Sequence, residues 1–212
     1  MCELLLRHQT IVPTPRPAVS ERLLKAIRVG LDQGEEAAVS SLSLLALNMA
    51  WMAVGLKLSG DYPPGYPDKS ADYIVDPAVR ELYAAALEVG WCLGPAGQSW
   101  SPGWIVAVDR PAFDELNAAL DSPPSEMSDV RIGRALGYPE SDILAFAESA
   151  GIDPKVTEVL TKEPGLGRYM TYVPYAEPGI ETLREAARRI HAVFGVRPPM
   201  QPSVYGPNGW NL

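Results

Sequence analysis

Hydrophobic positions between residues 37 and 58 recur at helical spacing along two separate lines. One line contains Leu42, Leu45, Met49, Met52 and Leu56. The other contains Leu44, Leu47, Trp51, Val54 and Leu58. Because the two lines lie on nearly opposite sides of one helix, they predict a central helix, over about 37–58, that is buried on both faces.

A membrane-spanning helix is the alternative interpretation of this segment. The segment from Ala37 to Leu56 carries no charge, and its 20 residues match the length that a membrane span needs. Polar and small residues interrupt the run, however: Ser40, Ser41, Ser43, Asn48 and Gly55. The segment is therefore better explained as a buried core helix.

Further helices are expected on both sides of the central helix. Ser20 is a plausible N-cap, and Asp76 before Pro77 and Glu177 before Pro178 have the composition of helix starts. Ser128 and Asp129 are expected to cap a helix that ends at Gly137. The predicted helices cover residues 20–33, 76–87, 111–120, 128–137, 139–150, 154–162 and 177–194.

Strands are predicted where β-branched and aromatic residues gather. These segments are residues 4–12, 103–109 and 168–175. The proline-rich stretch 61–72 is expected to be neither helix nor inner strand, because proline has no backbone N–H to donate. The sequence thus predicts a helix-dominated α+β fold with a small sheet, as a single domain over 1–196 followed by a proline-rich tail, 197–212.

The overall charge limits the partners of the protein. The net charge is −8 over 212 residues, which disfavours nucleic acid and anionic membranes as partners. With Cys2 and Cys92 as the two cysteines, no disulfide framework is expected. The first 15 residues lack the long apolar run of a secretion signal. We therefore expect a cytoplasmic protein, and the sequence leaves its oligomeric state open.

Residues 131–151 resemble the helix-turn-helix of bacterial repressors. The resemblance consists of Ile132, Ala135, Leu136, Gly137 and Ile143 at the packing positions. It implies a DNA-reading second helix, which should carry Arg, Lys, Asn or Gln. Residues 139–153 instead contain four carboxylates and no Lys or Arg. A plain αα-hairpin is the better interpretation.

Established catalytic and cofactor motifs are almost absent. A partial GxSxG around Ser99, followed by Asp109 and His191, is weakened by Ser101 in place of the second glycine. Four aspartates in one loop region could bind magnesium, but they are better explained as turn residues and a helix cap: Asp61, Asp68, Asp72 and Asp76. We expect no metal and no cofactor.

Aromatic residues give the best indication of a ligand site. Tyrosine and tryptophan combine an apolar face with a polar tip, so they line pockets as well as cores. Arg168 could hold an anionic group beside them. The candidate substrate-binding residues are Trp104, Tyr138, Arg168, Tyr169 and Tyr172.

Carboxylates at predicted element ends are the candidate catalytic groups. Asp109 follows the strand 103–109, and Glu140 and Asp142 lie at the corner of the predicted hairpin. Such groups can act as general bases or bind a cation. For Asp109 the competing interpretation is the N-cap of the next helix, since Pro111 follows in its first turn.

Two functions are consistent with these residues. The first is a cofactor-independent enzyme or binding protein for a small polar metabolite, with a pocket of tyrosines and carboxylates. The second is a non-catalytic accessory subunit that binds and stabilises a partner protein. Its basis is the tail, which carries Met200, Val204, Tyr205 and Trp210 among prolines. The sequence does not distinguish a catalytic from a binding role.

Overall fold

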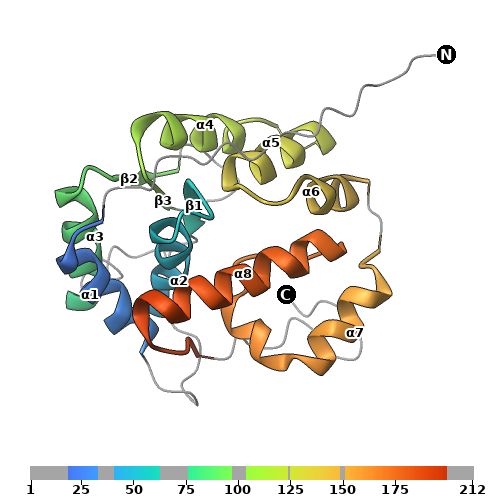
Figure 1. Cartoon of the computed structure of the whole chain (residues 1–212). Coiled ribbons are helices and arrows are strands. Elements are labelled where there is room, and N and C mark those ends of the chain that lie inside the picture. The colour runs from blue at the N-terminus through green and yellow to red at the C-terminus, as the bar shows by residue number, and fades with distance from the viewer. Residues whose placement is uncertain are drawn as a thin grey trace.

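The computed structural model describes residues 19–32, 41–62, 76–96, 104–123, 125–148 and 151–199. Over these residues the chain forms a helix-dominated α+β fold with one three-stranded antiparallel sheet (Figure 1). The predicted fold class is confirmed. The predicted strand at 4–12 and most of the proline-rich stretch lie outside the described residues.

The central helix is α2, Ser41–Ala53. Side chains on both of its faces are inaccessible, since Leu45 and Leu47 are fully buried and Trp51 is 1% exposed. Helices α1 (Glu21–Leu31), α3 (Pro77–Glu88) and α8 (Glu177–Phe194) pack against it. The prediction of burial on both faces is confirmed, but α2 ends before residue 58, because Gly55 takes a left-handed conformation with φ of 74°.

The sheet lies next to α2 and has the order β1-β3-β2. Its strands are β1 (Ser59–Tyr62), β2 (Cys92–Pro95) and β3 (Trp104–Ala107). Val106 in β3 lies opposite Gly60 on one side and Leu93 on the other. Of these three, only β3 was predicted, since β1 and β2 contain the weak strand formers Gly, Ser, Asp and Pro.

A second, smaller core lies between the sheet and three further helices. Ile105 of β3 packs with Leu116 of α4 (Arg110–Leu120) and Leu136 of α5 (Glu126–Leu136). Helix α6 (Glu140–Ala147) then packs on α5, where a Cβ on Gly133 would lie 2.8 Å from Ile143 Cγ1. The α5–α6 pair is thus the expected αα-hairpin.

Most predicted helix ends agree with the structure. Ser20 and Asp76 cap α1 and α3 through their side chains, and Gly137 ends α5 with a φ of 78°. The predicted cap at Ser128 and Asp129 is wrong: Ser125 is the N-cap of α5. Ser128 lies three residues later in a capping box, donating and accepting hydrogen bonds with Ser125.

The predicted strand at 168–175 is also wrong. Helix α7 (Pro154–Lys162) is followed by a 3₁₀ helix, η2 (Pro164–Tyr169), and an irregular segment that leads into α8. Pro174 has no backbone N–H, and the N–H groups of Tyr175 and Ala176 donate to Asp142. The backbone therefore has few donors left for a strand partner.

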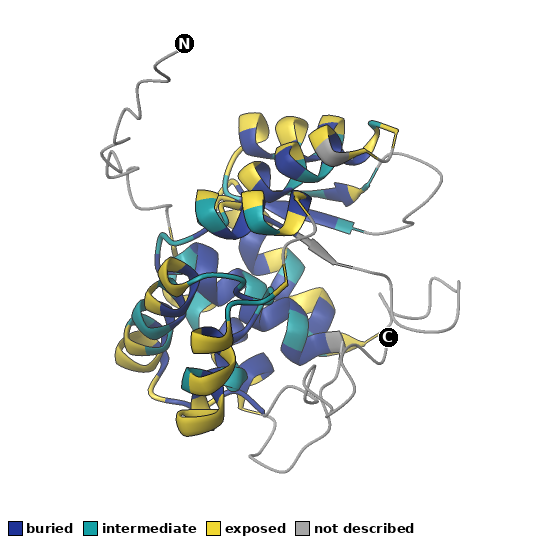
Figure 2. Ribbon diagram, turned by 90° about the vertical axis from the view of Figure 1, so that its right-hand side faces the viewer, coloured by how far each residue is buried: buried dark blue, intermediate teal, exposed yellow. Residues whose placement is uncertain are grey.

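Burial follows the layers of the fold. Figure 2 shows buried residues along the inner sides of the helices and across the sheet, with exposed residues on the outer sides. Val196, Pro198 and Pro199, which follow α8, are buried against the same body. No helix in the described ranges is both long and apolar enough to span a bilayer.

Candidate functional site

Three of the predicted site residues meet where α5, α6 and the segment before α8 come together. Tyr138 lies between α5 and α6, Asp142 is in the first turn of α6, and Tyr172 is in the irregular segment 170–176. The rings of Tyr138 and Tyr172 stack with centroids 4.3 Å apart. The Tyr138 hydroxyl donates to the carbonyl oxygen of Thr171 at 3.4 Å. We call these three residues the tyrosine–aspartate cluster.

Asp142 has a structural role as the cap of α8. Its side chain is 3% exposed, and Oδ1 accepts hydrogen bonds from the N–H groups of Tyr175 (2.6 Å) and Ala176 (2.7 Å). Ala176, the N-cap residue of α8, has no side-chain hydrogen bond of its own to give. Asp142 therefore satisfies donors at the positive end of α8 from a different helix.

The second oxygen of Asp142 has no such partner. Oδ2 is buried and makes no hydrogen bond, and it is the carboxylate atom closest to Gly179 of α8, where a Cβ would also come within 2.8 Å of Asp142 Cγ. Burial raises the pKa of Asp142, and the two backbone N–H donors offset part of that rise. Asp142 is thus a buried carboxylate with one oxygen engaged and one not.

Tyr172 joins the cluster to the central helix. Burial raises its pKa most, and the neighbouring charge of Asp142 raises that pKa further. Its ring meets Trp51 of α2 edge-on at 6.1 Å, and Trp51 Nε1 donates to the carbonyl oxygen of Tyr169 at 2.9 Å. Tyr169 is a fourth predicted site residue, and this hydrogen bond with Trp51 links it to the cluster.

Lys57 is a candidate that the sequence analysis missed. It is 2% exposed, which is rare for lysine. Its ammonium donates to Asn48 Oδ1 at 3.0 Å and lies 5.0 Å from the ring centroid of Tyr138. The feature of the sequence that could have indicated this site is Asn48, an amide side chain inside the apolar α2. The burial of Lys57 itself results from the packing of α2, β1 and α5.

The other predicted catalytic residues have separate structural roles. Asp109 is the N-cap of α4, accepting from the N–H of Ala112 at 2.9 Å, so the cap interpretation is confirmed. Glu140 is exposed and pairs with Arg134 of α5, whose guanidinium lowers the pKa of that carboxyl group. Neither joins the contacts that link Tyr138, Tyr172 and Asp142.

Arg168 and Trp104 also lie apart from the cluster contacts. Arg168 Nη1 donates to the carbonyl oxygen of Pro198 at 2.9 Å, which ties the residues after α8 to η2. Trp104 begins β3 and stacks on Tyr83 of α3 with centroids 5.8 Å apart. The structure thus divides the predicted site into the cluster and several residues with other contacts.

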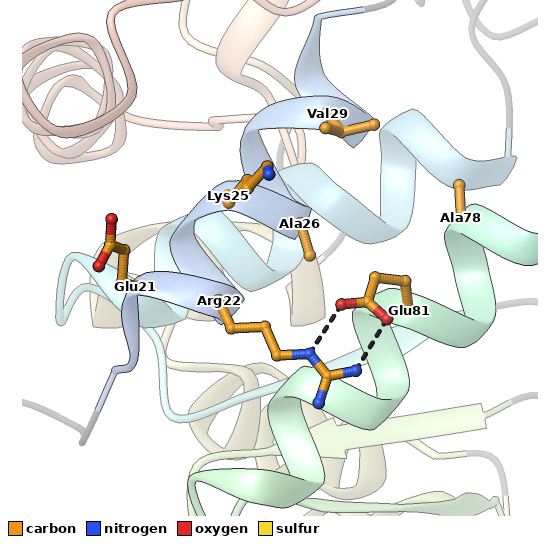
Figure 3. A pocket seen from close by; sticks show the side chains of 7 residues that line it. All are labelled: Glu21, Arg22, Lys25, Ala26, Val29, Ala78 and Glu81. Carbon is orange, nitrogen blue, oxygen red and sulfur yellow. Dashed lines mark hydrogen bonds and ion pairs between the residues drawn. The ribbon is translucent and has the colours of Figure 1, made fainter.

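A surface groove between α1 and α3 is a second place to consider (Figure 3). Its volume is about 500 Å³, and it is lined by Glu21, Arg22, Lys25, Ala26, Val29, Ala78 and Glu81. Arg22 spans it, with Nε 2.8 Å from Glu81 and Nη1 2.7 Å from Glu88. In Figure 3 the side chains of Glu21 and Lys25 point away from this ion pair. The charges at the groove therefore serve mainly to join the two helices.

The alternatives from the sequence receive no further geometric support. Ser99 lies outside the described residues, and His191 is exposed in the last turn of α8. Asp76 caps α3, while Asp68 and Asp72 lie outside the described residues. Within the parts of the chain that the structure describes, no three His, Cys, Asp or Glu side chains gather as metal ligands would.

Comparison with known protein families, with curated proteins and with solved structures finds no match to this chain.

Proposed function

We propose that the protein binds a small polar metabolite at the tyrosine–aspartate cluster, without a cofactor. The observation that supports this most is the set of buried oxygens without a hydrogen-bond partner, Asp142 Oδ2 and Thr171 Oγ1, beside two stacked tyrosines. Buried polar atoms in native proteins are nearly always paired, so unpaired ones mark the place where a ligand or water completes the network.

Exposure differs within this region. Tyr138, Thr171, Tyr172 and Tyr175 are partly exposed, whereas Asp142 is buried. In this proposal the ligand contacts the partly exposed tyrosines. Aromatic walls with a few polar groups are typical of small-molecule sites.

Asp142 in this proposal is a binding residue. Its Oδ1 remains with α8, and Oδ2 receives a hydrogen-bond donor of the ligand. Removing Oδ1 from α8 for proton transfer would leave two backbone N–H groups without their acceptor. We therefore assign Asp142 to ligand binding and not to proton transfer. If the ligand is converted, the reacting groups lie next to Tyr138 or Tyr172.

The test is thermal unfolding with a panel of polar metabolites in three protein forms. A ligand at 100 times its Kd stabilises a fold by about 2.7 kcal/mol, which for a chain of this size shifts Tm by roughly 5–10 °C. We expect such a shift in the wild type and a smaller one in Tyr172→Phe. Tyr83→Phe, which removes a hydroxyl near Trp104, is the matched control and should behave as the wild type.

An equal response in Tyr172→Phe and Tyr83→Phe, for every compound that binds, would place binding elsewhere and contradict the proposal.

The accessory-subunit function stays a prediction. Its basis was the tail, and residues 196–199 pack on their own domain, while residues 200–212 lie outside the described residues. Deleting residues 200–212 tests it, since an obligate partner would then be lost on copurification. The cytoplasm remains our proposed location.

A further inference from the structure

We propose that two copies of this chain associate through the face formed by α1 and α3, with the two α1 helices antiparallel. This face contains the groove of Figure 3, which has a volume of about 500 Å³ and shares no residue with the tyrosine–aspartate cluster. Ala26 and Ala78 line the groove, and their small side chains let a second helix approach closely. Association through this face does not depend on the proposed function.

The charges of this face balance, although the whole chain is acidic. The seven residues that line the groove include two acidic and two basic side chains, with a net charge of zero: Glu21, Glu81, Arg22 and Lys25. Two copies of a chain with a net charge of −8 repel each other. A face without net charge adds nothing to this repulsion at close range, so it is a favourable place for two copies to meet.

Glu21 and Lys25 are the charged groups of this face that do not join α1 to α3. Arg22 joins the two helices through Glu81 and Glu88. Glu21 and Lys25 point away from that contact (Figure 3), are exposed, and form no ion pair within the part of the chain that the structure describes. The two lie one turn apart on α1, so they offer a negative and a positive charge at a fixed spacing.

The α1 helix of a second copy matches this pattern. When two antiparallel α1 helices meet between residues 21 and 25, Glu21 of each copy faces Lys25 of the other, and two-fold symmetry forms the pair twice. Val19, just before α1, is 38% exposed, and Val29, in its last turn, is 51% exposed. The same alignment brings Val29 of each copy near Val19 of the other. The face is therefore complementary to itself in charge and in apolar groups.

Other classes of partner match the two charges less well. An acidic peptide or another polyanion would be attracted by Lys25 but repelled by Glu21 one turn away. A basic partner would meet the same conflict with the signs reversed. A surface that carries both charges at the same spacing and in the opposite direction satisfies both, and α1 of a second copy is such a surface.

The size of the face sets the expected strength of association. Helix α1 has 11 residues, which makes it about 16 Å long, and two helices side by side are about 20 Å wide. The area covered on each copy is on the order of 300–500 Å², which is less than a standard stable interface covers. We therefore expect a weak dimer, with a Kd on the order of 100 μM.

The test is analytical ultracentrifugation of the full chain at pH 7.5, from about 10 μM to about 1 mM, a range that brackets this Kd. We expect a monomer–dimer equilibrium in the wild type. Lys25→Glu places like charges opposite each other twice and should weaken association at least about tenfold. The matched control is Lys155→Glu, because Lys155 is exposed on α7 and its reversal changes the net charge equally. The control should associate nearly as well as the wild type.

A complementary variant makes the test specific for this face. Glu21→Lys also places like charges opposite each other and should weaken self-association by a similar factor. A mixture of Lys25→Glu and Glu21→Lys chains should associate again, because every facing pair then has opposite charges. Circular dichroism checks that each variant is folded.

Three results would overturn the proposal. The first is a wild type that stays monomeric up to about 1 mM, as expected if another protein or another segment of the chain occupies the face. The second is a dimer that Lys25→Glu and Lys155→Glu weaken equally, since the interface would then lie elsewhere. The third is a mixture of the two complementary variants that associates no better than either variant alone.

Discussion

The two carboxylate oxygens of Asp142 have different surroundings. Oδ1 accepts two backbone hydrogen bonds from the start of α8, while Oδ2 is buried without a donor. The sequence singled out Asp142 as a catalytic candidate from its place at a hairpin corner. It could not show which backbone groups would meet it, because Tyr175 and Ala176 are 33 and 34 residues away in sequence.

The contact between Asp142 and Gly179 leads to a first prediction. Gly179→Ala puts a Cβ where the Asp142 carboxylate lies, so we expect a loss of about 1–3 kcal/mol in the free energy of unfolding. In an Asp142→Ala background the same change should be neutral or stabilising by up to about 1 kcal/mol, because Ala favours helix over Gly. Urea unfolding of the four proteins measures the coupling. An equal effect of Gly179→Ala in both backgrounds would contradict the contact.

The raised pKa of Asp142 leads to a second prediction. A folded-state pKa above the ordinary value of 3.8 means that the unfolded chain ionises first as the pH rises. The folded state therefore loses stability between pH 3.8 and the raised pKa. Asp142→Asn has no such loss, so its stability relative to the wild type should increase from pH 3 to pH 7, measured by urea midpoints. A difference that stays constant with pH, or decreases, would exclude a raised pKa.

At the scale of elements, helix ends are held both by local residues and by distant ones. Ser20 and Asp109 cap α1 and α4 from the adjacent position, which is why the sequence predicted these helix starts. Asp142 caps α8, and Arg189 of α8 donates to the carbonyl oxygen of Val54 after α2 at 3.1 Å. These two contacts depend on tertiary packing and had no local signal.

The predicted strand at 168–175 failed for the same reason. Its tyrosines, Val173 and Thr171 have the composition of a strand, but the donors at its end bind Asp142 and not a neighbouring strand. The composition correctly marked a half-buried aromatic segment. The conformation of the segment depends instead on the hydrogen bonds that its backbone N–H groups donate to Asp142.

The role of Asp109 gives a prediction at this scale. As the N-cap of α4, it can be replaced by Ser with little loss, whereas Asp109→Ala should cost about 1 kcal/mol in the free energy of unfolding. Ligand binding at the cluster should be unchanged in both variants. The check is urea unfolding together with the metabolite panel. Loss of binding in Asp109→Ser, with the fold intact, would restore Asp109 as a site residue.

At the scale of the whole molecule, the periodicity of α2 was the most informative feature of the sequence. It predicted a helix buried on both sides, and the main core is built around it. The small sheet was only partly predictable, since β1 (SGDY) and β2 (CLGP) consist largely of weak strand formers. Lys57, which connects α2 with Tyr138, is buried by the assembly of the whole fold.

The exposed ion pairs give a prediction for the whole molecule in acid. Arg188 and then Arg189 lower the pKa of Glu185 to about 2, and Arg22 and Arg184 lower those of Glu81 and Glu163 below their ordinary 4.5. Such groups stabilise the fold above their unfolded pKa, and this contribution is lost as the pH falls toward the folded value.

Stability should therefore decrease from pH 5 to pH 2.5, less steeply in Glu185→Gln and in high salt, which screens exposed pairs. Urea midpoints across that range provide the measurement. The same steepness in Glu185→Gln and the wild type would show that this pair contributes nothing in solution.

The most direct test of the central claim is ¹⁹F NMR of protein in which the nine tyrosines carry fluorine, assigned by single Tyr→Phe changes and titrated with the metabolite panel. If the tyrosine–aspartate cluster is the binding site, the Tyr138 and Tyr172 signals shift together and saturate with one ligand, while the Tyr83 signal stays in place. Saturable binding that moves Tyr83 or other tyrosines and leaves Tyr138 and Tyr172 unchanged would contradict the account.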